Sequence, residues 1–231
     1  RYNLILENAN SHHFDMHGAR DYEKYNQKAI YKLDESSGLN ADDAATFTDH
    51  DCTLTNLTDA SWVDGYVGNA IRFGSFEDGG STVHTYLECE VGEHLESDEG
   101  SISFFFKPDE MPYRHMDLLY MGNSTNNTSW YRDYLLIRMR DDGRLLLIIE
   151  RNDNTHVSLA SSLRVQDTNW HHVAITQNGD GVKLYLNGVL DENTTGTNSG
   201  AWTDGWRVNG GNGVERFVFG GATSGSGNRL W

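Results

Sequence analysis

Two polar stretches of the chain carry aromatic residues of the kind that bind sugars. Trp130, Tyr131 and Tyr134 lie beside an Asn-rich loop, and Trp202 and Trp206 lie in a Gly/Asn-rich one. Exposed aromatic rings stack on the apolar face of a pyranose, and neighbouring amide and carboxylate groups bind its hydroxyls. We predict these five residues as glycan contacts. The alternative is that the rings fold back on the protein's own core or pack against another subunit.

The histidines offer two further groups that could bind a metal ion. His171 and His172 are adjacent in an apolar run. Neighbouring strand residues point to opposite faces, so this pair cannot chelate one ion and is predicted to be structural. His12, His13 and His17 could form a loose transition-metal site, although solvated loop histidines are the more common arrangement.

Composition limits the classes of partner. The 231 residues include 34 acidic and 18 basic side chains, which gives a net charge of −16. Such a surface repels phosphate backbones and anionic lipid headgroups, so neither nucleic acid nor a membrane surface is an expected partner. No run of 18 apolar residues exists that could span a membrane. This balance suits an extracellular protein, and it is compatible with bound Ca²⁺.

The two cysteines leave two interpretations open. Cys52 and Cys89 each lie in a strand-like run. They form one disulfide in an oxidising compartment, or they are two buried thiols that act as small hydrophobic residues.

Short apolar runs separated by turn residues predict an all-β protein with little helix. Asp141-Asp142-Gly143 joins two apolar runs in the clearest hairpin, and Asn187-Gly188 marks another tight turn. About ten to twelve short strands at such spacing describe an antiparallel sandwich of two sheets or a barrel. We expect residues 1–28 to form an N-terminal arm or strand, which could contact another subunit, and residues 29–231 to form one sandwich domain.

Three stretches resemble the laminin-G-like (LamG type 3) domains of the concanavalin A-like lectin/glucanase superfamily. They are Tyr31–Gly38 continuing to Trp62–Phe73, then Gly100–Pro108, and finally Asn169–Thr176 followed by Val182–Gly188. They occur in the order found in that family, over about Ala29 to Gly221. The resemblance implies a jelly-roll sandwich, with Trp62 and Trp170 in its core and the Trp170-His171-His172 segment in a packing role.

The resemblance also raises two site predictions. Glucanases of this superfamily carry catalytic carboxylates as Glu-x-Asp-x-x-Glu on one strand, whereas this chain offers only Glu88-Cys89-Glu90, without a third partner. We therefore predict no enzyme. Relatives often hold Ca²⁺ at a sheet rim through Asp or Asn side chains. Calcium is thus the only cofactor considered, and its candidate ligands are Asp34, Asp49, Asp51 and Asp78.

The family's closing strand has no counterpart before Trp231. The missing strand is explained by truncation, by Tyr2 to Glu7 filling the gap, or by a strand from a neighbouring copy, which would produce head-to-tail polymers. The leading hypothesis is therefore a non-catalytic module of an extracellular assembly on a cell or virion surface: a fibre, an adhesin or a virion decoration protein. Its partners would be copies of itself or other assembly subunits. The alternative is a carbohydrate-binding module, and a glycoside hydrolase is the third.

Overall fold

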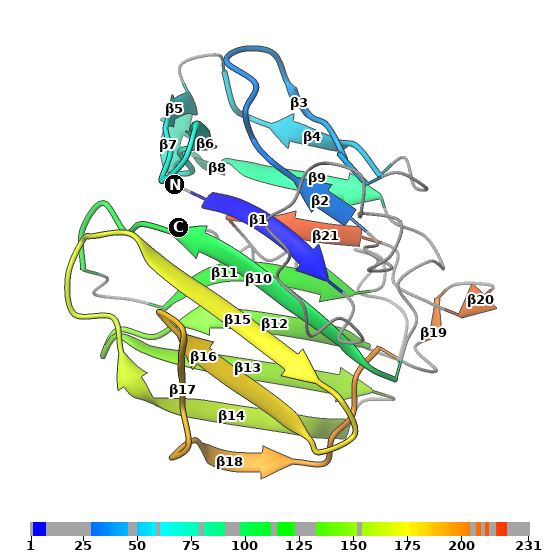
Figure 1. Ribbon diagram of the computed structural model, residues 1–231. Helices are drawn as coiled ribbons and strands as arrows, with labels where there is room; N and C mark the ends of the chain where they lie inside the picture. The colour runs from blue at the N-terminus through cyan, green and yellow to red at the C-terminus, as the bar shows by residue number, and fades with distance from the viewer. Residues whose placement is uncertain are drawn as a thin grey trace, which may run out of the picture.

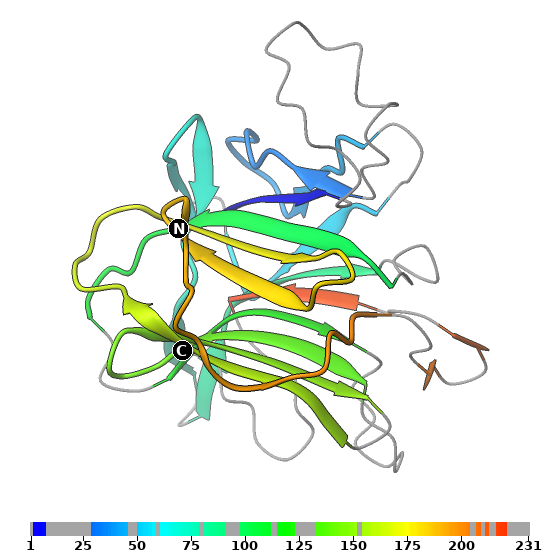
Figure 2. The ribbon, with the colours of Figure 1, turned by 60° about the horizontal axis from the view of Figure 1, so that its bottom comes forward.

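The computed structural model describes residues 2–7, 29–45, 50–58, 61–78, 81–90, 98–111, 115–122, 133–151, 154–203, 207–208, 211–212 and 216–220. Two large antiparallel sheets contain most of these residues and face each other (Figure 1). Figure 2 shows β10, β15 and β16 of one sheet above the layer that holds β11 to β14. The predicted all-β jelly-roll sandwich is confirmed, and no helix among the described residues could cross a membrane.

The first sheet has eight strands in the order β17-β16-β15-β10-β1-β6-β5, with β2 paired to β1. Its strands are β1 (Tyr2–Glu7), β2 (Ala29–Tyr31), β5 (Trp62–Asp64), β6 (Asn69–Ile71), β10 (Gly100–Phe106), β15 (His171–Gln177), β16 (Val182–Leu186) and β17 (Val189–Leu190). The segment Tyr2–Glu7, considered above as one way to fill a gap, pairs with β10 along its whole length. The chain itself therefore supplies the strand beside β10.

The second sheet has nine strands in the order β18-β14-β13-β12-β11-β21-β9-β4-β3. Its strands are β3 (Asn40–Ala41), β4 (Cys52–Thr55), β9 (Tyr86–Glu90), β11 (Met116–Gly122), β12 (Tyr134–Met139), β13 (Arg144–Arg151), β14 (Asn154–Arg164), β18 (Thr195–Asn198) and β21 (Arg216–Phe219). Two small ribbons complete the set: β7 (Ser75–Asp78) with β8 (Ser81–His84), and β19 (Arg207–Val208) with β20 (Gly211–Asn212). The described residues contain 21 strands, more than the predicted ten to twelve, because many of these strands are only two to four residues long.

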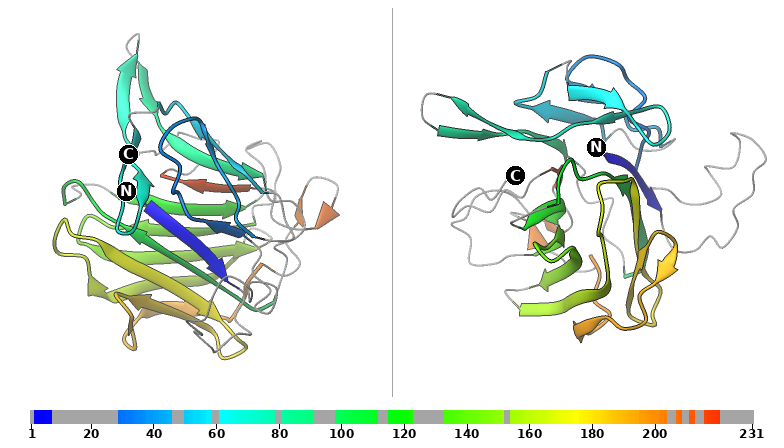
Figure 3. Two further views of the ribbon diagram at one scale, coloured as in Figure 1. Left: turned by 45° about the horizontal axis from the view of Figure 1, so that its top comes forward. Right: turned by 90° about the vertical axis from the view of Figure 1, so that its left-hand side faces the viewer.

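The core lies between the two sheets, and Figure 3 shows the layers from two further directions. Side chains of a strand alternate between its faces, so every second residue points inward. Phe104 and Phe106 of β10 are buried in this way, as are Leu145 and Leu147 of β13. Cys52 and Cys89 pair across β4 and β9 and form a disulfide on the inner face, which resolves the two interpretations of the cysteines.

Two of the predicted turns connect neighbouring strands, β12 to β13 and β16 to β17. Gly143 closes the β12–β13 hairpin with φ of 78°, and a Cβ there would lie 2.2 Å from the Val165 carbonyl oxygen. Only glycine fits this position without strain. Asn187 and Gly188 have φ of 53° and 78° between β16 and β17, as in a type I′ turn.

Candidate functional site

The outer face of the nine-stranded sheet carries Tyr134, one of the five predicted glycan contacts. Leu135 and Ile137 of β12 are buried in the core, so the alternating residues Tyr134 and Arg138 point away from it. The same alternation on β11 turns Tyr120 outward. We call this surface the tyrosine–arginine face, and its defining residues are Glu88, Asp117, Tyr120, Tyr134, Arg138 and Arg216.

Tyr120 and Tyr134 form a stacked aromatic pair at the centre of this face. Their ring centroids are 5.8 Å apart and their planes differ by 23°. The register places Tyr134 opposite Gly122, so Tyr120 is its diagonal neighbour across β11 and β12. A Cβ at Gly122 would lie 2.7 Å from the Tyr120 hydroxyl oxygen, so the glycine leaves the space that this ring uses. Both tyrosines are half-buried.

A buried ion pair flanks the tyrosines toward one end of β12. Asp117 and Arg138 are directly opposite each other, and Arg138 Nη2 donates to Asp117 Oδ2 over 2.9 Å while Nε donates to Oδ1. The carboxylate is fully buried and the guanidinium side chain is 18% exposed. This hydrogen-bonded pairing with Asp117 raises the pKa of Arg138, although burial alone would lower it. The bidentate geometry fixes the guanidinium plane on the face.

A second ion pair lies on the other side of the tyrosines. Arg216 on β21 places Nη1 2.5 Å from Glu88 Oε1 on β9. Both side chains remain about one-fifth exposed, at 19% and 23%. Arg216 is also opposite Gly122 of β11, and Gly122 is opposite Tyr134 of β12 on its other side. The two ion pairs therefore flank the aromatic pair on neighbouring strands of one surface.

This arrangement combines the two kinds of group that bind saccharides. A half-exposed aromatic pair offers ring faces to the apolar side of a sugar. An arginine has five N–H donors, and a bidentate pair with a carboxylate uses only two of them. The remaining donors of Arg138 and Arg216 and the partly exposed Glu88 carboxylate can bind hydroxyl groups. Among the residues that the structure describes, no group of three or more His, Cys, Asp or Glu could hold a metal ion.

Of the other four predicted glycan contacts, Trp202 is the one that lies within the described residues. Trp202 is 4% exposed, so the prediction that it stacks on a sugar is wrong. Its indole packs against Gly100, where a Cβ would lie 2.6 Å from Nε1. Trp130, Tyr131 and Trp206 lie outside the described residues.

The structure gives contacts for two of the four predicted calcium ligands, Asp34 and Asp51, and the calcium site stays a prediction. Asp34 is exposed, and its backbone carbonyl accepts a hydrogen bond from Asn69. Asp51 uses Oδ1 to accept the Asp43 backbone N–H over 2.8 Å. Asp49 lies outside the described residues, and nothing is described of the Asp78 side chain on β7.

The adjacent histidines point to opposite faces of β15. His171 is buried, with Nε2 3.1 Å from Asp167 Oδ1 and Nδ1 3.2 Å from Asn187 Nδ2. Its two ring nitrogens are thus occupied by neighbouring side chains. His172 points outward, and partial burial lowers its pKa. His12, His13 and His17 lie outside the described residues.

Sequence reasoning missed an aromatic cluster on the outer face of the eight-stranded sheet. Tyr66 is 57% exposed and stacks on Phe105, with centroids 4.5 Å apart and planes 11° apart. Trp170, predicted as core, is only partly buried and meets Tyr66 edge-on at 6.3 Å. Trp62 is buried as predicted. The position of Phe105 between the buried Phe104 and Phe106 is the signal in the sequence that could have placed it outward.

Comparisons with known proteins identify the family. A laminin G type 3 model, described as concanavalin A-like lectin/glucanases superfamily, matches residues 78–224. No curated protein matches the chain. Similar solved structures include the CBM40 of a Ruminococcus gnavus IT-sialidase bound to α2,3 sialyllactose. It is 18% identical, with a TM-score of 0.46, and the match covers 58% of this chain and 70% of that one.

Two other similar structures cover more of the chain. Domain 4 of AbnA, an extracellular GH43 arabinanase from Geobacillus stearothermophilus, in complex with arabinotriose, is 14% identical over 83% of this chain and 91% of that one, with a TM-score of 0.41. A Bacillus licheniformis β-glucanase is 7% identical over 94% of this chain and 82% of that one, with a TM-score of 0.42. The family model spans more than half of the sequence, and the chain belongs to the concanavalin A-like lectin/glucanases superfamily.

Proposed function

We propose that this protein is a carbohydrate-binding module that contacts glycans through the tyrosine–arginine face. The observation that carries the proposal is the stacked pair of Tyr120 and Tyr134, flanked by the Asp117–Arg138 and Glu88–Arg216 ion pairs. Membership of a superfamily that includes lectins supports it. This was the alternative hypothesis from the sequence.

The assembly hypothesis has less support. It depended on an open edge at a missing strand, and β1 of the same chain lies beside β10. Glycan binding, by contrast, has a described surface with suitable side chains.

An extracellular location is part of the proposal. Structural disulfides persist mainly in oxidising compartments. The Cys52–Cys89 disulfide and the net charge of −16 both fit such an environment. The location can be tested by recovering the protein from its source and titrating free thiols, which should be absent before reduction.

Binding to an immobilised panel of neutral and acidic oligosaccharides tests the proposal, followed by calorimetric titration with the strongest ligand. Tyr134→Ala should weaken affinity about tenfold or more, because loss of an aromatic anchor costs about 2 kcal/mol at a binding surface. The matched control is Tyr185→Ala, which removes a half-buried tyrosine from the outer face of β16 in the other sheet.

Tyr185→Ala should leave the affinity unchanged. A panel without any binding, or an equal loss for the two tyrosine variants, would contradict the proposal. Circular dichroism and a thermal melt of each variant separate loss of a contact from loss of the fold.

A further inference from the structure

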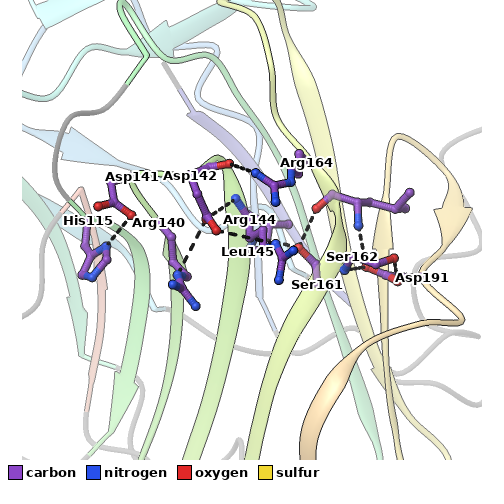
Figure 4. A network of polar contacts seen from close by, with 11 residues as sticks. His115, Arg140, Asp141, Asp142, Arg144, Leu145, Ser161, Ser162, Arg164 and Asp191 are labelled. Atoms are coloured by element: carbon purple, nitrogen blue, oxygen red, sulfur yellow. Dashed lines mark hydrogen bonds and ion pairs between the residues drawn. The ribbon is translucent and has the colours of Figure 1, made fainter.

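Three arginines gather around one aspartate at the β12–β13 hairpin (Figure 4). Arg140 Nε lies 3.7 Å from Asp142 Oδ1, and Arg144 Nε lies 3.5 Å from Asp142 Oδ2. Arg164 Nη1 donates to the Asp142 carbonyl oxygen over 3.1 Å. We call Arg140, Arg144 and Arg164 the arginine triad. It is not part of the surface to which glycan binding was assigned above.

Backbone hydrogen bonds hold the triad in place. Arg140 N–H donates to the Arg144 carbonyl over 2.8 Å, and Gly143 N–H donates to the Arg140 carbonyl over 2.9 Å. Arg164 is opposite Arg144 in the pairing of β13 with β14, and the next residue, Val165, donates to the Gly143 carbonyl. The positions from which the three guanidinium groups extend are therefore set by the turn.

The positive charge of the triad exceeds what its protein partners neutralise. Arg140 and Arg144 share the one carboxylate of Asp142, Arg164 bonds the Asp142 backbone carbonyl, and the neighbouring Asp141 lies 4.0 Å from His115. Among the described residues, the bond from Arg164 to Asp142 is the only hydrogen bond that the triad's side chains donate. The Nε atoms of Arg140 and Arg144 are buried and have no hydrogen-bond partner in the part of the chain that the structure describes. In a chain with net charge −16, this is a local concentration of arginine with donors to spare.

The triad lies on the same side of the sheet as the tyrosines. Tyr134, Leu136, Arg138 and Arg140 are alternate residues of one strand and its extension, so all four point away from the core. Strand residues advance about 3.3 Å each, which puts the Cα of Arg140 about 20 Å from that of Tyr134. A short oligosaccharide can span this distance.

We infer that the arginine triad is an anion subsite that extends the tyrosine–arginine face and directs it toward acidic saccharides, whose carboxylate or sulfate groups it binds. The inference depends on the proposed glycan binding and names its ligand class. Arginine suits this role because its planar fork matches a carboxylate or a sulfate in a bidentate geometry. The acidic remainder of the chain disfavours long polyanions such as nucleic acid, which would meet repulsion beyond the triad.

Calorimetric titration with a matched pair of ligands tests the inference. One is a tetrasaccharide that contains uronic acid, and the other is the same tetrasaccharide with its carboxylates reduced to alcohols. The native protein should bind the acid about tenfold or more tightly than the reduced form, as expected for charge-assisted hydrogen bonds. The preference should shrink as salt is raised.

Two variants and one control locate the preference. The double variant Arg140→Gln/Arg144→Gln should bring the ratio of the two affinities close to one. Asp142→Asn should increase the ratio, because it removes the competing negative charge and keeps Oδ1, which accepts the Arg144 N–H over 3.1 Å. Arg72→Gln changes an exposed arginine that pairs with Asp109 next to the other sheet, and it should leave the ratio unchanged.

The outcomes separate the two proposals. An undiminished preference in the double variant, or no increase in Asp142→Asn, would overturn the anion subsite while glycan binding remains. Binding of neither tetrasaccharide, in a protein that binds nothing on the oligosaccharide panel, would remove both. Binding to vesicles of anionic lipid, without binding to the acidic tetrasaccharide, would overturn the choice of a saccharide. If the double variant fails to fold, Asp142→Asn decides by itself.

Discussion

The outer faces of the two sheets are built by the same alternation but carry different chemistry. On the nine-stranded sheet the outward residues include two tyrosines, two inter-strand ion pairs and the arginine triad. On the eight-stranded sheet, β10 and β15 turn outward mainly small side chains and one aromatic pair. These residues are Ser101, Ser103, Phe105, His172, Ala174 and Thr176.

The difference separates the positions that form the core from the positions whose chemistry can vary between the faces. Most inward residues of both sheets that the structure describes are aliphatic or aromatic and form one core. Outward residues are free of that requirement, so their chemistry can differ between faces. The proposed function is therefore argued from the outward-facing residues, because the fold itself does not specify a function.

The largest expected difference between the faces concerns a buried charge. Arg138→Leu leaves the Asp117 carboxylate buried and unpaired, which should lower the free energy of unfolding by about 3–5 kcal/mol. Arg72→Leu breaks the exposed pair with Asp109 next to the other sheet and should cost less than about 1 kcal/mol. Guanidinium denaturation measures both. Equal losses would show that Asp117–Arg138 is no more important than a surface pair.

The disulfide gives the nine-stranded sheet a second stabilising link. Cys52 and Cys89 are 37 residues apart in the sequence, so their cross-link restricts the unfolded chain. Cys52→Ala/Cys89→Ala should lower the unfolding free energy by about 3–4 kcal/mol. A loss of unfolding free energy below about 1 kcal/mol would mean that the pairing of β4 with β9 is stable without the disulfide.

Asp191 connects the two sheets and makes stability depend on pH. It follows β17 and accepts hydrogen bonds from Ser162 N (2.6 Å), Ser162 Oγ (2.6 Å) and Leu163 N (3.0 Å) on β14, and from Asn193 N (3.1 Å). Burial alone would raise its pKa, but these bonds outweigh burial and hold the pKa below its ordinary value.

The sign of the pH effect follows from that lowered pKa. The stabilisation is complete above the unfolded pKa of about 3.9 and is lost as pH falls through the folded value. Asp191→Asn should cost about 2 kcal/mol at pH 7, and it should flatten the decline of stability below about pH 4. Unfolding curves from pH 7 to pH 2 measure both effects. A variant with the same acid profile as the native protein would exclude this role.

Tyr66 provides the smallest and most selective test of the comparison. Tyr66→Ala removes the exposed ring that stacks on Phe105 and should cost about 1 kcal/mol of stability. Glycan affinity should not change, because the ring lies on the eight-stranded sheet. A tenfold loss of affinity would place the binding surface on the opposite face.

Local signals in the sequence predicted the elements that depend on them. Asp142-Gly143 and Asn187-Gly188 marked turns that the structure confirms, because positive φ is a local requirement. Apolar alternation did not predict β14, the longest of the described strands. The inward-facing residues of β14 end in Ser161, so the apolar alternation stops before the strand does. The Ser161 hydroxyl accepts the Leu145 N–H instead. The strand is completed by a hydrogen bond that hydrophobic periodicity does not reveal.

The site was harder to predict because it is assembled across strands. Tyr134 was identified from its own loop, but Tyr120, Asp117 and Arg216 join it through the pairing of β11 with β12 and β21. That register depends on long-range contacts. The burial of Trp202 against Gly100 is equally non-local, so a loop position alone wrongly indicated an exposed ring.

The most direct test of the central claim is a solution NMR titration with a bound oligosaccharide from the panel. The account predicts amide shifts that change along β11, β12 and β21, with β10, β15 and β16 unaffected. With an acidic ligand, the changes should extend to the hairpin residues 140–144. Shifts confined to β10, β15 and β16 would contradict the assignment of glycan binding to the nine-stranded sheet.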